Sequence, residues 1–537
     1  MSDNIRALCS RRGVESSLLT ALETAAAAAG TPSAEDLGRL AADYRLSPAA
    51  VLGTASFYEF LAPHHRGRRG YVCSGTACLL AGRQDEARER LRATLTDAEI
   101  GEMACLGRCY RGGAFQLDGH QCDAADLDGH ASPADPIPFR SAALQSVFGP
   151  PSAEPLDDYG TALRPPAEIL GELQVSRLRG RGGAGFPFGR KLAACADAAG
   201  GAKYVVCNAD EGDPGAFSDR WLLEVHPHRV MAGMLGAATA IGATTGVLYV
   251  RAEYPLAVAR VREAIEAFHA TAIAQATGFR FELVRGAGSY VCGEETALLN
   301  SIEGLRPEVR VRPPYPAQHG LFGQPTLVSN VETFACVPWI LQHGGAAYAA
   351  LGTPDSTGTK LACLDHHFHR PGVYEVPMGL PLDTLLHDLG GGFRVPVKAL
   401  QIGGPLGSVV PVKRTAQLAL DFESFSRAGF LLGHASLVAI PADFPMRDFL
   451  AHLFEFASNE SCGKCFPCRL GTRRGHEWLR AATPEHPIDA GAFGDLLETL
   501  ELGSLCALGG GLPLPVRNVL AHFADELRPL FRGAVPG

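Results

Sequence analysis

The sequence predicts a multidomain α/β protein with a cysteine cluster near each end. The chain has 537 residues, 46% of them apolar, which is enough for two to four domains with sizeable cores. Strand-like and helix-like patterns alternate through its first and central parts, whereas the spacing from Pro445 onward is mainly helical. These observations exclude a disordered or fibrous protein.

Residues 1–130 are expected to form helices followed by a small α/β unit. Helical spacing covers 16–29 and 33–44, and a third helix is expected after Ser47, where Pro48 suits a first turn. A strand is predicted at 70–73, a charged helix at 84–95 and a second strand at 114–117. The Pro- and Asp-rich stretch 131–166 is expected to be a linker.

The rest of the chain is divided into three parts. Residues 167–335 are expected to form an α/β domain, with clear strands at 204–207 and 246–250. The Gly- and Pro-punctuated region 336–425 is predicted to be a small β-rich module, and 426–537 a helical domain.

Charge and hydropathy argue against two classes of partner. Lys and Arg total 48 against 57 Asp and Glu, so a net charge of −9 offers no broad basic surface for nucleic acid. Residues 230–250 carry no charge, but they are rich in Gly and Ala and are broken at Gly242 and Gly246. We expect a packed helix followed by a strand there, and no membrane insertion. The first residues show no signal peptide, so we expect a cytoplasmic location.

Four cysteines near the N-terminus, Cys73, Cys78, Cys105 and Cys109, form two closely spaced pairs. Four thiolates from two loops can ligate both irons of a [2Fe–2S] cluster. A zinc site and two chance pairs are the alternatives that spacing alone leaves open.

The C-terminal set has a more specific spacing. Cys462, Cys465 and Cys468 stand three residues apart, and Cys506 follows much later in the chain. Three close thiolates and one remote thiolate are the usual ligands of a [4Fe–4S] cubane, whereas a zinc ribbon has two separate pairs. The other cysteines are expected to be small core residues: Cys9, Cys122, Cys195, Cys207, Cys292, Cys336 and Cys363.

A glycine-rich loop at 180–185 satisfies the pattern of a dinucleotide-binding fingerprint. That fingerprint requires a strand just before the loop, and the segment 165–178 is helical in pattern, so an ordinary Rossmann site is not expected. The glycines still expose backbone N–H groups to a phosphate or flat ring, with positive charge from Arg181 and Lys191. A plain tight turn is the alternative.

Two further segments carry acidic residues in loops that could also contact a ligand. The stretch Asn208-Ala-Asp210-Glu211-Gly-Asp213 follows the strand at 204–207, at the end where α/β folds gather ligands. The segment 286–295 combines glycines with Glu294 and Glu295. Such carboxylates accept hydrogen bonds from ribose hydroxyls and flavin ring N–H groups. The alternative is that they lie on a solvated loop and bind no ligand.

Together these segments resemble the flavoprotein, NADH-binding subunit of the complex I family. The resemblance rests on RGRGGAGFP at 179–187, NADEGDPG at 208–215, GAGSYVCGEE at 286–295, the segment 312–333, ESCGKCFPCRLGT at 460–472 and SLCALG at 504–509. Residues 33–122, with SFYEF at 56–60, also resemble the thioredoxin-like [2Fe–2S] subunit of the same systems. The resemblance implies a thioredoxin-like domain in 1–130 and a ubiquitin-like module at 336–425.

The resemblance also implies site residues. FMN is expected to contact Arg181, Gly182, Gly183, Gly185, Lys191, Asn208, Asp210, Glu211, Glu294, Ser329 and Asn330. The nicotinamide nucleotide is expected to contact Phe186, Asp213, Glu295, Arg312 and Tyr315, with Phe186 and Glu295 orienting the nicotinamide.

The chain departs from the family at several of these positions. Relatives often have Glu, Lys and Phe where this chain has Asp213, Arg312 and Tyr315, and Leu192 and Ala194 replace aromatic residues that would stack on adenine. The segment 363–372 replaces a Gly-rich version; a metal site of His366, His367 and His369 is conceivable there, but a surface loop is expected.

The function implied is electron transfer between NAD(H), FMN and the two clusters, because a flavin accepts hydride and passes single electrons. We expect the β subunit of an NAD-dependent formate dehydrogenase, whose large partner carries molybdenum or tungsten and further iron–sulfur clusters. The diaphorase subunit of an NAD-reducing hydrogenase and the complex I flavoprotein subunit are alternatives. A zinc-containing, nucleotide-binding scaffold is the alternative from another class.

Overall fold

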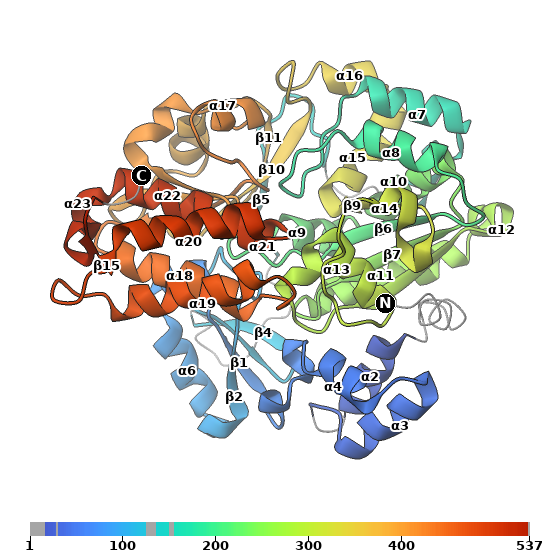
Figure 1. Ribbon diagram of the computed structural model, residues 1–537. Helices are drawn as coiled ribbons and strands as arrows, with labels where there is room; N and C mark the ends of the chain where they lie inside the picture. The colour runs from blue at the N-terminus through green and yellow to red at the C-terminus, as the bar shows by residue number, and fades with distance from the viewer. Residues whose placement is uncertain (1–16, 28–29, 125–135, 150–154, 535–537) are drawn as a thin grey trace.

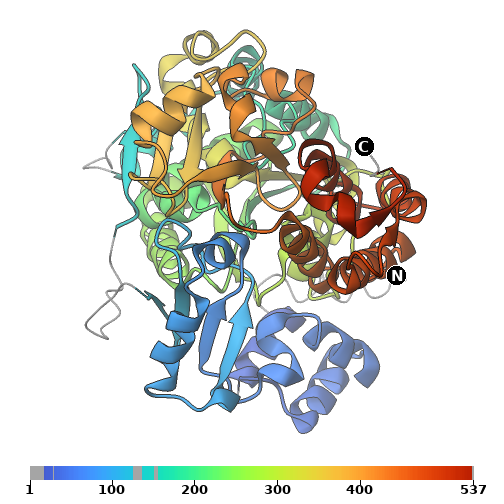
Figure 2. The ribbon, with the colours of Figure 1, turned by 90° about the vertical axis from the view of Figure 1, so that its left-hand side faces the viewer.

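A computed structural model describes residues 17–27, 30–124, 136–149 and 155–534. Within these residues the strands form two four-stranded sheets, a six-stranded sheet and a two-stranded pair. Figures 1 and 2 show the N-terminal helices and the four-stranded sheet of β1 to β4 together at the bottom of the molecule. The parts that contain the other four-stranded sheet, the six-stranded sheet and the C-terminal helices lie above them.

The N-terminal helices begin with well-defined caps. They are α2 (Leu18–Ala26), α3 (Ala34–Tyr44) and α4 (Pro48–Ala55). Ser33 and Asp36 form a reciprocal capping box at α3, and Pro48 occupies the first turn of α4, as the sequence predicts. Their buried leucines pack against the central sheet, so this segment covers one face of that sheet.

The first sheet has the strand order β2-β1-β3-β4. Strand β1 (Gly70–Cys73) runs parallel to β2 (Ile100–Met103) and antiparallel to β3 (Ala114–Leu117), which pairs with β4 (His120–Asp123). Helices α5 (Thr76–Ala81) and α6 (Gln84–Arg92) follow β1. The predicted strands and the charged helix of this unit are confirmed.

The central sheet is wholly parallel and has the order β8-β7-β6-β9. Its strands are β6 (Tyr204–Ala209), β7 (Thr245–Val250), β8 (Arg280–Arg285) and β9 (Thr326–Asn330). Its helices are α7 (Pro166–Val175), α8 (Phe188–Asp197), α9 (Ser218–Val225), α10 (Pro227–Ile241), α11 (Pro255–His269), α12 (Ala272–Thr277), α13 (Glu295–Ile302), α14 (Pro316–His319) and α15 (Val331–His343). Helix α7 precedes the glycine loop, so the loop does not follow a strand.

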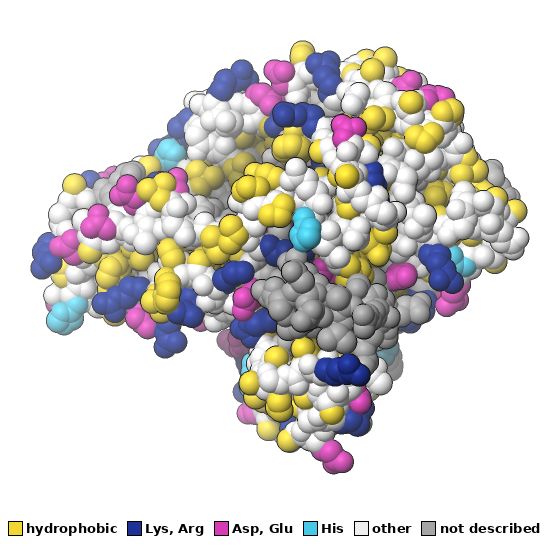
Figure 3. Space-filling view, turned by 45° about the vertical axis from the view of Figure 1, so that its right-hand side comes forward, with side chains coloured by type: hydrophobic (Ala, Val, Ile, Leu, Met, Phe, Trp, Pro, Cys, Tyr) yellow, Lys and Arg dark blue, Asp and Glu magenta, His cyan; other side chains and the backbone are white. Residues whose placement is uncertain are grey.

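The uncharged segment 230–250 forms the buried helix α10 and strand β7, as expected. In the described part of the chain, no helix is both long and apolar enough to cross a bilayer. Basic and acidic side chains lie among one another over the face in Figure 3. The described non-cluster cysteines are all buried, whereas Cys9 lies outside the described residues.

The six-stranded sheet differs from the predicted module in its limits. Its order is β13-β12-β14-β10-β11-β5. The strands are β5 (Phe139–Ser141), β10 (Thr359–Leu364), β11 (Gly372–Pro377), β12 (Val397–Ile402), β13 (Ser408–Pro411) and β14 (Ser436–Pro441), accompanied by α16 (Gly345–Ala349) and α17 (Phe422–Arg427). The sheet therefore extends past residue 425, and α15 crosses the boundary expected at 335–336.

The stretch expected as a linker is partly built into the structure. Strand β5 pairs in parallel with β11, and the carboxylate of Glu375 accepts hydrogen bonds from the backbone N–H groups of Val147 and Phe148. The 3-10 helix η4 (Pro155–Leu163) also buries Tyr159 in the main core. Tertiary pairing thus orders a segment whose local pattern shows only turns.

The C-terminal part is helical. It contains α18 (Met446–Asn459), α19 (Phe466–Ala481), α20 (Ala490–Gly503), α21 (Ala507–Gly510), α22 (Pro513–His522) and α23 (Ala524–Leu527), with the short strands β15 (Ile488–Asp489) and β16 (Phe531–Arg532). Figure 1 shows α20 and α21 pointing toward the central part of the molecule, which places residues after α20 beside the site described next.

Candidate functional site

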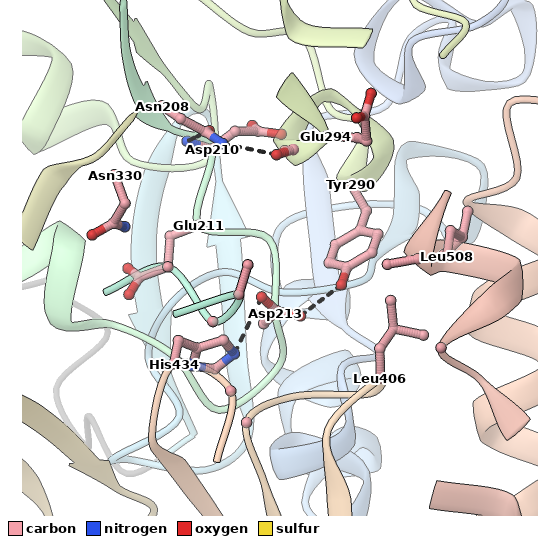
Figure 4. Close-up of a pocket in the computed structure, with 18 of the residues that line it drawn as sticks. Asn208, Asp210, Glu211, Asp213, Tyr290, Glu294, Asn330, Leu406, His434 and Leu508 are labelled. Atoms are coloured by element: carbon pink, nitrogen blue, oxygen red, sulfur yellow. Dashed lines mark hydrogen bonds and ion pairs between the residues drawn. The ribbon is translucent and has the colours of Figure 1, made fainter. Parts of the chain in front are cut away.

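A cavity of about 410 Å³ lies where the central sheet, the six-stranded sheet and the C-terminal helices meet. Its size is in the range of pockets that hold a cofactor. From the central part of the chain, the lining comes from the glycine loop (181–184), from the loop 208–215 at the end of β6, called the acidic loop below, from the segment 290–294 and from Asn330. Two loops of the six-stranded sheet and residues 506–511 complete it. Figure 4 shows Asp210 and Glu211 on the left, Asp213 in the middle, and Leu406 and Leu508 on the right.

Two asparagines mark the carboxyl ends of adjacent strands. Asn208 on β6 lies directly beside Asn330 on β9 in the parallel register. Asn208 donates from Nδ2 to the Gly293 carbonyl at 2.8 Å, and Asn330 caps α15 while donating to Asp219 at 2.5 Å. The strand ends therefore bring together residues that the sequence separates by more than a hundred positions.

The acidic loop holds carboxyl groups in unusually dry surroundings. Burial raises the pKa of Asp210 well above its ordinary value, and it also raises the pKa of Glu211. Glu211 accepts hydrogen bonds from the backbone N–H groups of Asp219 and Arg220. Asp210 Oδ2 is buried and has no partner within the described residues, so it is available to a ligand in the cavity.

Asp213 is held between two residues from other parts of the fold. The Tyr290 hydroxyl donates to Asp213 at 2.7 Å, and His434 Nε2 lies 3.1 Å from the other carboxylate oxygen (Figure 4). Burial acts in the opposite direction, but the charge of His434 and both hydrogen bonds keep the pKa of Asp213 below its ordinary value. Sequence reasoning assigned no role to Tyr290 or His434; only Tyr290 lay in a recognised segment.

Several expected contacts lie outside the cavity lining. Lys191 Nζ is 3.0 Å from Glu295 Oε2, and Arg312 is 3.0 Å from the other oxygen of Glu295, so these three form an ion-pair chain. Phe186 and Tyr315 are both exposed. Gly185 and Ser329 also fall outside the lining, whereas the other expected FMN contacts except Lys191 are part of it.

Arg181, one of the two expected cations of the glycine loop, is buried and lines the cavity. Its side chain is buried and donates to the Tyr348 hydroxyl and the Thr357 carbonyl, while Nε and one terminal nitrogen have no partner in the described part. The neighbouring Gly183 has φ +118°, a conformation that favours glycine. The loop thus offers backbone close to the cavity.

The four C-terminal cysteines converge beside the cavity. Cys465 precedes α19, Cys468 lies in its first turn, and Cys506 precedes α21 and lines the cavity itself. The Ser461 hydroxyl lies 3.3 Å from Cys468 Sγ. Burial raises the pKa of the Cys468 thiol to about 11, and the neighbouring Cys465 and Cys462 thiols contribute to this shift.

The four N-terminal cysteines are all buried. Cys105 Sγ and Cys109 Sγ are 3.8 Å apart. A tetrahedral metal with Cys bonds of about 2.3 Å holds its sulfurs about 3.8 Å apart, so this pair suits one iron. The backbone N–H of Gly215 donates to Cys109 Sγ at 3.2 Å, which connects this cysteine site directly to the acidic loop.

The segment at 363–372 is not the surface loop that the sequence suggested. Asp365 and His367 are buried, and the backbone N–H of His366 donates to the Cys109 carbonyl at 3.1 Å, whereas His369 is exposed. The segment is buried because it packs against the first sheet. Leu192, one of the family departures, is a core residue.

The residues present fit the expected cofactors. The cavity volume, the close glycine backbone and the unpartnered Asp210 oxygen suit a flavin nucleotide, and each set of four thiols suits an iron–sulfur cluster. The fold and the site therefore define a flavin and iron–sulfur protein of the electron-transfer class.

Comparison with known proteins gives the family. Residues 173–339 match the Nuo51 FMN-binding domain, 448–529 the NADH-ubiquinone oxidoreductase-F iron-sulfur binding region, and 6–129 the thioredoxin-like [2Fe-2S] ferredoxin. The F 2 subunit of the NADH-quinone oxidoreductase of Rhizobium meliloti is 42% identical over 67% of this chain and 88% of its own length.

Two further similarities extend over nearly the whole chain. The alpha subunit of the NAD-reducing hydrogenase HoxS of Cupriavidus necator is 35% identical over 91% of this chain and 88% of its own length. A crystal structure of an NAD⁺-reducing [NiFe]-hydrogenase in the H₂-reduced state has a TM-score of 0.84 and 32% identity, covering 96% of this chain and 93% of that chain.

The chain belongs to the family of NADH dehydrogenase flavoprotein and diaphorase subunits. It is an oxidoreductase subunit that uses FMN, [4Fe–4S] and [2Fe–2S] clusters and NAD(H). This result confirms the expected cofactors and the multidomain α/β fold, and it removes the support for a zinc-containing scaffold.

Proposed function

We propose that the chain exchanges electrons between NAD(H) and a partner subunit through one continuous site. The observation that carries the proposal is the cavity itself, which reaches from the glycine loop to Cys506. FMN would be held by the loop 181–185, Asn208, Asp210, Glu211, Glu294 and Asn330, with Lys191 and Ser329 nearby. FMN, when bound, supplies the change from hydride to single-electron chemistry.

The nicotinamide nucleotide would enter from the exposed side of this site. Phe186 and Tyr315 present exposed aromatic rings, which suit stacking on a planar base. Arg312 and Lys191 meet on Glu295, so this carboxylate is oriented by two cations before a ligand arrives. We assign Phe186 and Glu295 to orienting the nicotinamide, with Asp213 and Arg312 as further nucleotide contacts.

Electrons would leave through the C-terminal cysteine site formed by Cys462, Cys465, Cys468 and Cys506. Cys465 and Cys506 are partly exposed, unlike the four N-terminal cysteines. Four exposed apolar side chains lie within four positions of these cysteines in the sequence, namely Phe466, Leu470, Leu502 and Leu505. Exposed apolar groups around a redox centre suit the docking of a partner protein.

We propose that the partner is a large formate dehydrogenase subunit with a molybdenum or tungsten cofactor and further iron–sulfur clusters. The fusion of a [2Fe–2S] domain to the flavin domain supports this interpretation, because such a chain combines two parts that complex I keeps separate. The location we propose is cytoplasmic.

A hydrogenase partner is the second candidate, and a specific observation favours it. The hydrogenase subunit and the hydrogenase structure are similar to this chain from the N-terminal [2Fe–2S] part to the C-terminal helices. A complex I flavoprotein role is supported over the shorter region that matches the Rhizobium meliloti protein.

Purification of the native complex tests both levels of the proposal. The chain is expected to contain FMN and roughly six irons, two plus four from the cluster types, and to reduce a dye with NADH. Molybdenum or tungsten in the co-purifying large subunit would support the formate dehydrogenase hypothesis, whereas nickel would replace it with the hydrogenase hypothesis. A chain without flavin or NADH-dye activity would refute the diaphorase proposal itself.

A further inference from the structure

A group of metal-ligating side chains lies away from both cysteine sites, between the N-terminal helices and the first sheet. Glu59 Oε1 is 2.6 Å from His65 Nε2 and 3.4 Å from His64 Nε2. One ligand atom from each of the three residues lies within 4.8 Å of the other two. None of these residues takes part in the flavin or cluster sites.

Two consecutive 3-10 turns bring the three side chains together. Glu59 begins η1 (Glu59–Leu61), and both histidines belong to η2 (Pro63–His65), which starts at a proline. Leu61 at the end of η1 and Ala62 between the turns are buried, so they anchor this segment to the core. The arrangement is therefore fixed by local backbone structure rather than by flexible side chains alone.

His65 is oriented as metal-ligating histidines usually are. Its Nδ1 lies 3.1 Å from the Tyr71 hydroxyl, and its ring stacks on Tyr71 with centroids 5.2 Å apart. A polar partner at one ring nitrogen fixes the ring and leaves the other nitrogen for a metal. In His65 that other nitrogen, Nε2, faces Glu59.

The site is accessible to solvent, and one carboxyl group from another part of the fold interacts with it. His64 is 61% exposed at its side chain and Glu59 43%, so an ion can enter and a water molecule can complete its coordination. Burial raises the pKa of the nearby Glu460 to about 7, and the charge of Glu59 contributes to this shift. The Arg68 guanidinium donates hydrogen bonds to the carbonyls of His64 and Ile100.

We propose that Glu59, His64 and His65 bind a divalent cation of the zinc class, with a fourth position open to water. Zinc accepts His nitrogen and carboxylate oxygen at about 2.0–2.2 Å in tetrahedral geometry, so its ligands lie about 3.3 Å apart. The observed separations of 2.6 and 3.4 Å need only a small opening of the Glu59–His65 pair.

The other candidate group in the described residues is less suitable. Asp365, His366 and His367 are also close together, but Asp365 already accepts hydrogen bonds from the backbone N–H groups of His367 and Ala439. Asp365 and His367 of that group are also buried, whereas His64 in the proposed site is exposed.

A cation at the proposed site would connect three parts of the fold. The backbone N–H groups of Glu59 and Phe60 donate to the carbonyls of Gly288 and Ala287, in the loop that leads to Tyr290. Tyr71 belongs to β1 of the first sheet. Since the unfolded chain lacks this arrangement, binding would stabilise the folded protein.

Zinc uptake by the full chain with its flavin and clusters tests the proposal. After mild chelation and titration with Zn²⁺ alone, about one zinc ion per chain should be retained, with zinc–ligand distances of about 2.0–2.1 Å in X-ray absorption. The thermal midpoint should rise with added zinc. Failure to retain zinc would overturn the proposal. Distances of about 2.3 Å would also overturn it, because they would place zinc on cysteine sulfur.

Matched variants locate the ion. His64→Ala removes an exposed ligand and should weaken zinc binding at least about tenfold, and Tyr71→Phe should weaken it by roughly tenfold through loss of the His65 partner. His120→Ala removes an exposed histidine elsewhere and should bind zinc as the unaltered chain does. Equal binding by His64→Ala and the unaltered chain would contradict the assignment, whatever the NADH activity of either.

Discussion

The two cysteine regions differ in their surroundings and in how each is connected to the cavity. The N-terminal cysteines are all buried, and Cys109 accepts a hydrogen bond from Gly215 in the acidic loop. Two of the C-terminal cysteines, Cys465 and Cys506, are partly exposed, and Cys506 lines the cavity itself. Only the C-terminal region therefore reaches both the cavity and the surface.

This difference suggests separate roles for two sites that look alike in the sequence. A buried site that contacts the cavity only through a loop is suited to storing or tuning charge. A site open on both sides is suited to passing electrons outward. Four substitutions test this distinction, from the largest expected effect to the smallest.

Cys506→Ser should have the largest effect. It should remove about four irons per chain. It should also slow NADH-driven electron transfer to the partner at least about 100-fold, equivalent to about 2.7 kcal/mol. Iron analysis and turnover of the complex rebuilt with its partner measure both. Cys195→Ser, at a buried thiol outside both regions, is the control. Unchanged electron transfer in Cys506→Ser would contradict the proposal that the C-terminal site passes electrons to the partner.

Leu502→Asp should weaken partner binding without loss of iron or FMN. Leu502 is 77% exposed and stands four positions before Cys506, near the end of α20. A charge placed in an apolar interface costs about 1–2 kcal/mol, or roughly five- to thirtyfold in Kd. Binding of the purified partner, measured by surface plasmon resonance, gives the result. Leu144→Asp, at a fully exposed position elsewhere, should bind the partner normally. Equal affinities of the two variants would contradict the proposed docking surface around Leu502.

Asp210→Asn tests the loop between the two regions. Because burial raises the folded-state pKa of Asp210, the stability of the flavin-free chain should fall as pH rises from about 4 toward that pKa. Asparagine has no carboxyl group to ionise, so the Asn variant does not lose stability in this way. Its flavin-free form should therefore melt at a higher temperature than the flavin-free unaltered chain at pH 8. FMN affinity should nevertheless drop roughly tenfold, for a lost bond of about 1.5 kcal/mol.

The two measurements on Asp210→Asn are independent of each other. Thermal melts across pH report the buried carboxyl group, and flavin fluorescence reports FMN release. A flavin-free variant that melts below the unaltered chain at pH 8 would contradict the stability argument. Unchanged flavin affinity would contradict the assigned contact.

Cys105→Ser should have the smallest effect on transfer to the partner. About two irons should be lost, but turnover with the partner should fall less than about tenfold, equivalent to about 1.4 kcal/mol. Thermal melting and FMN content show whether the buried site still folds. A loss as large as that of Cys506→Ser, with FMN retained, would place the N-terminal site on the main path.

The sequence by itself determined the features that depend on local spacing. The positions of Cys462, Cys465 and Cys468 predicted a [4Fe–4S] site, and the family match supports the cofactor. The helical pattern before the glycine loop argued against an ordinary dinucleotide fingerprint, and α7 confirms that a helix precedes the loop. Such features are readable because residues a few positions apart must meet on one turn or strand.

Only the tertiary structure decided which distant residues meet. It placed His434 and Tyr290 on Asp213, joined Gly215 to Cys109, and paired β5 from the expected linker with β11. These contacts join segments separated by up to about 240 positions, and no local period encodes them. They arise because packing the sheets and the C-terminal helices around one cavity brings these loops together, as the two cysteine regions show.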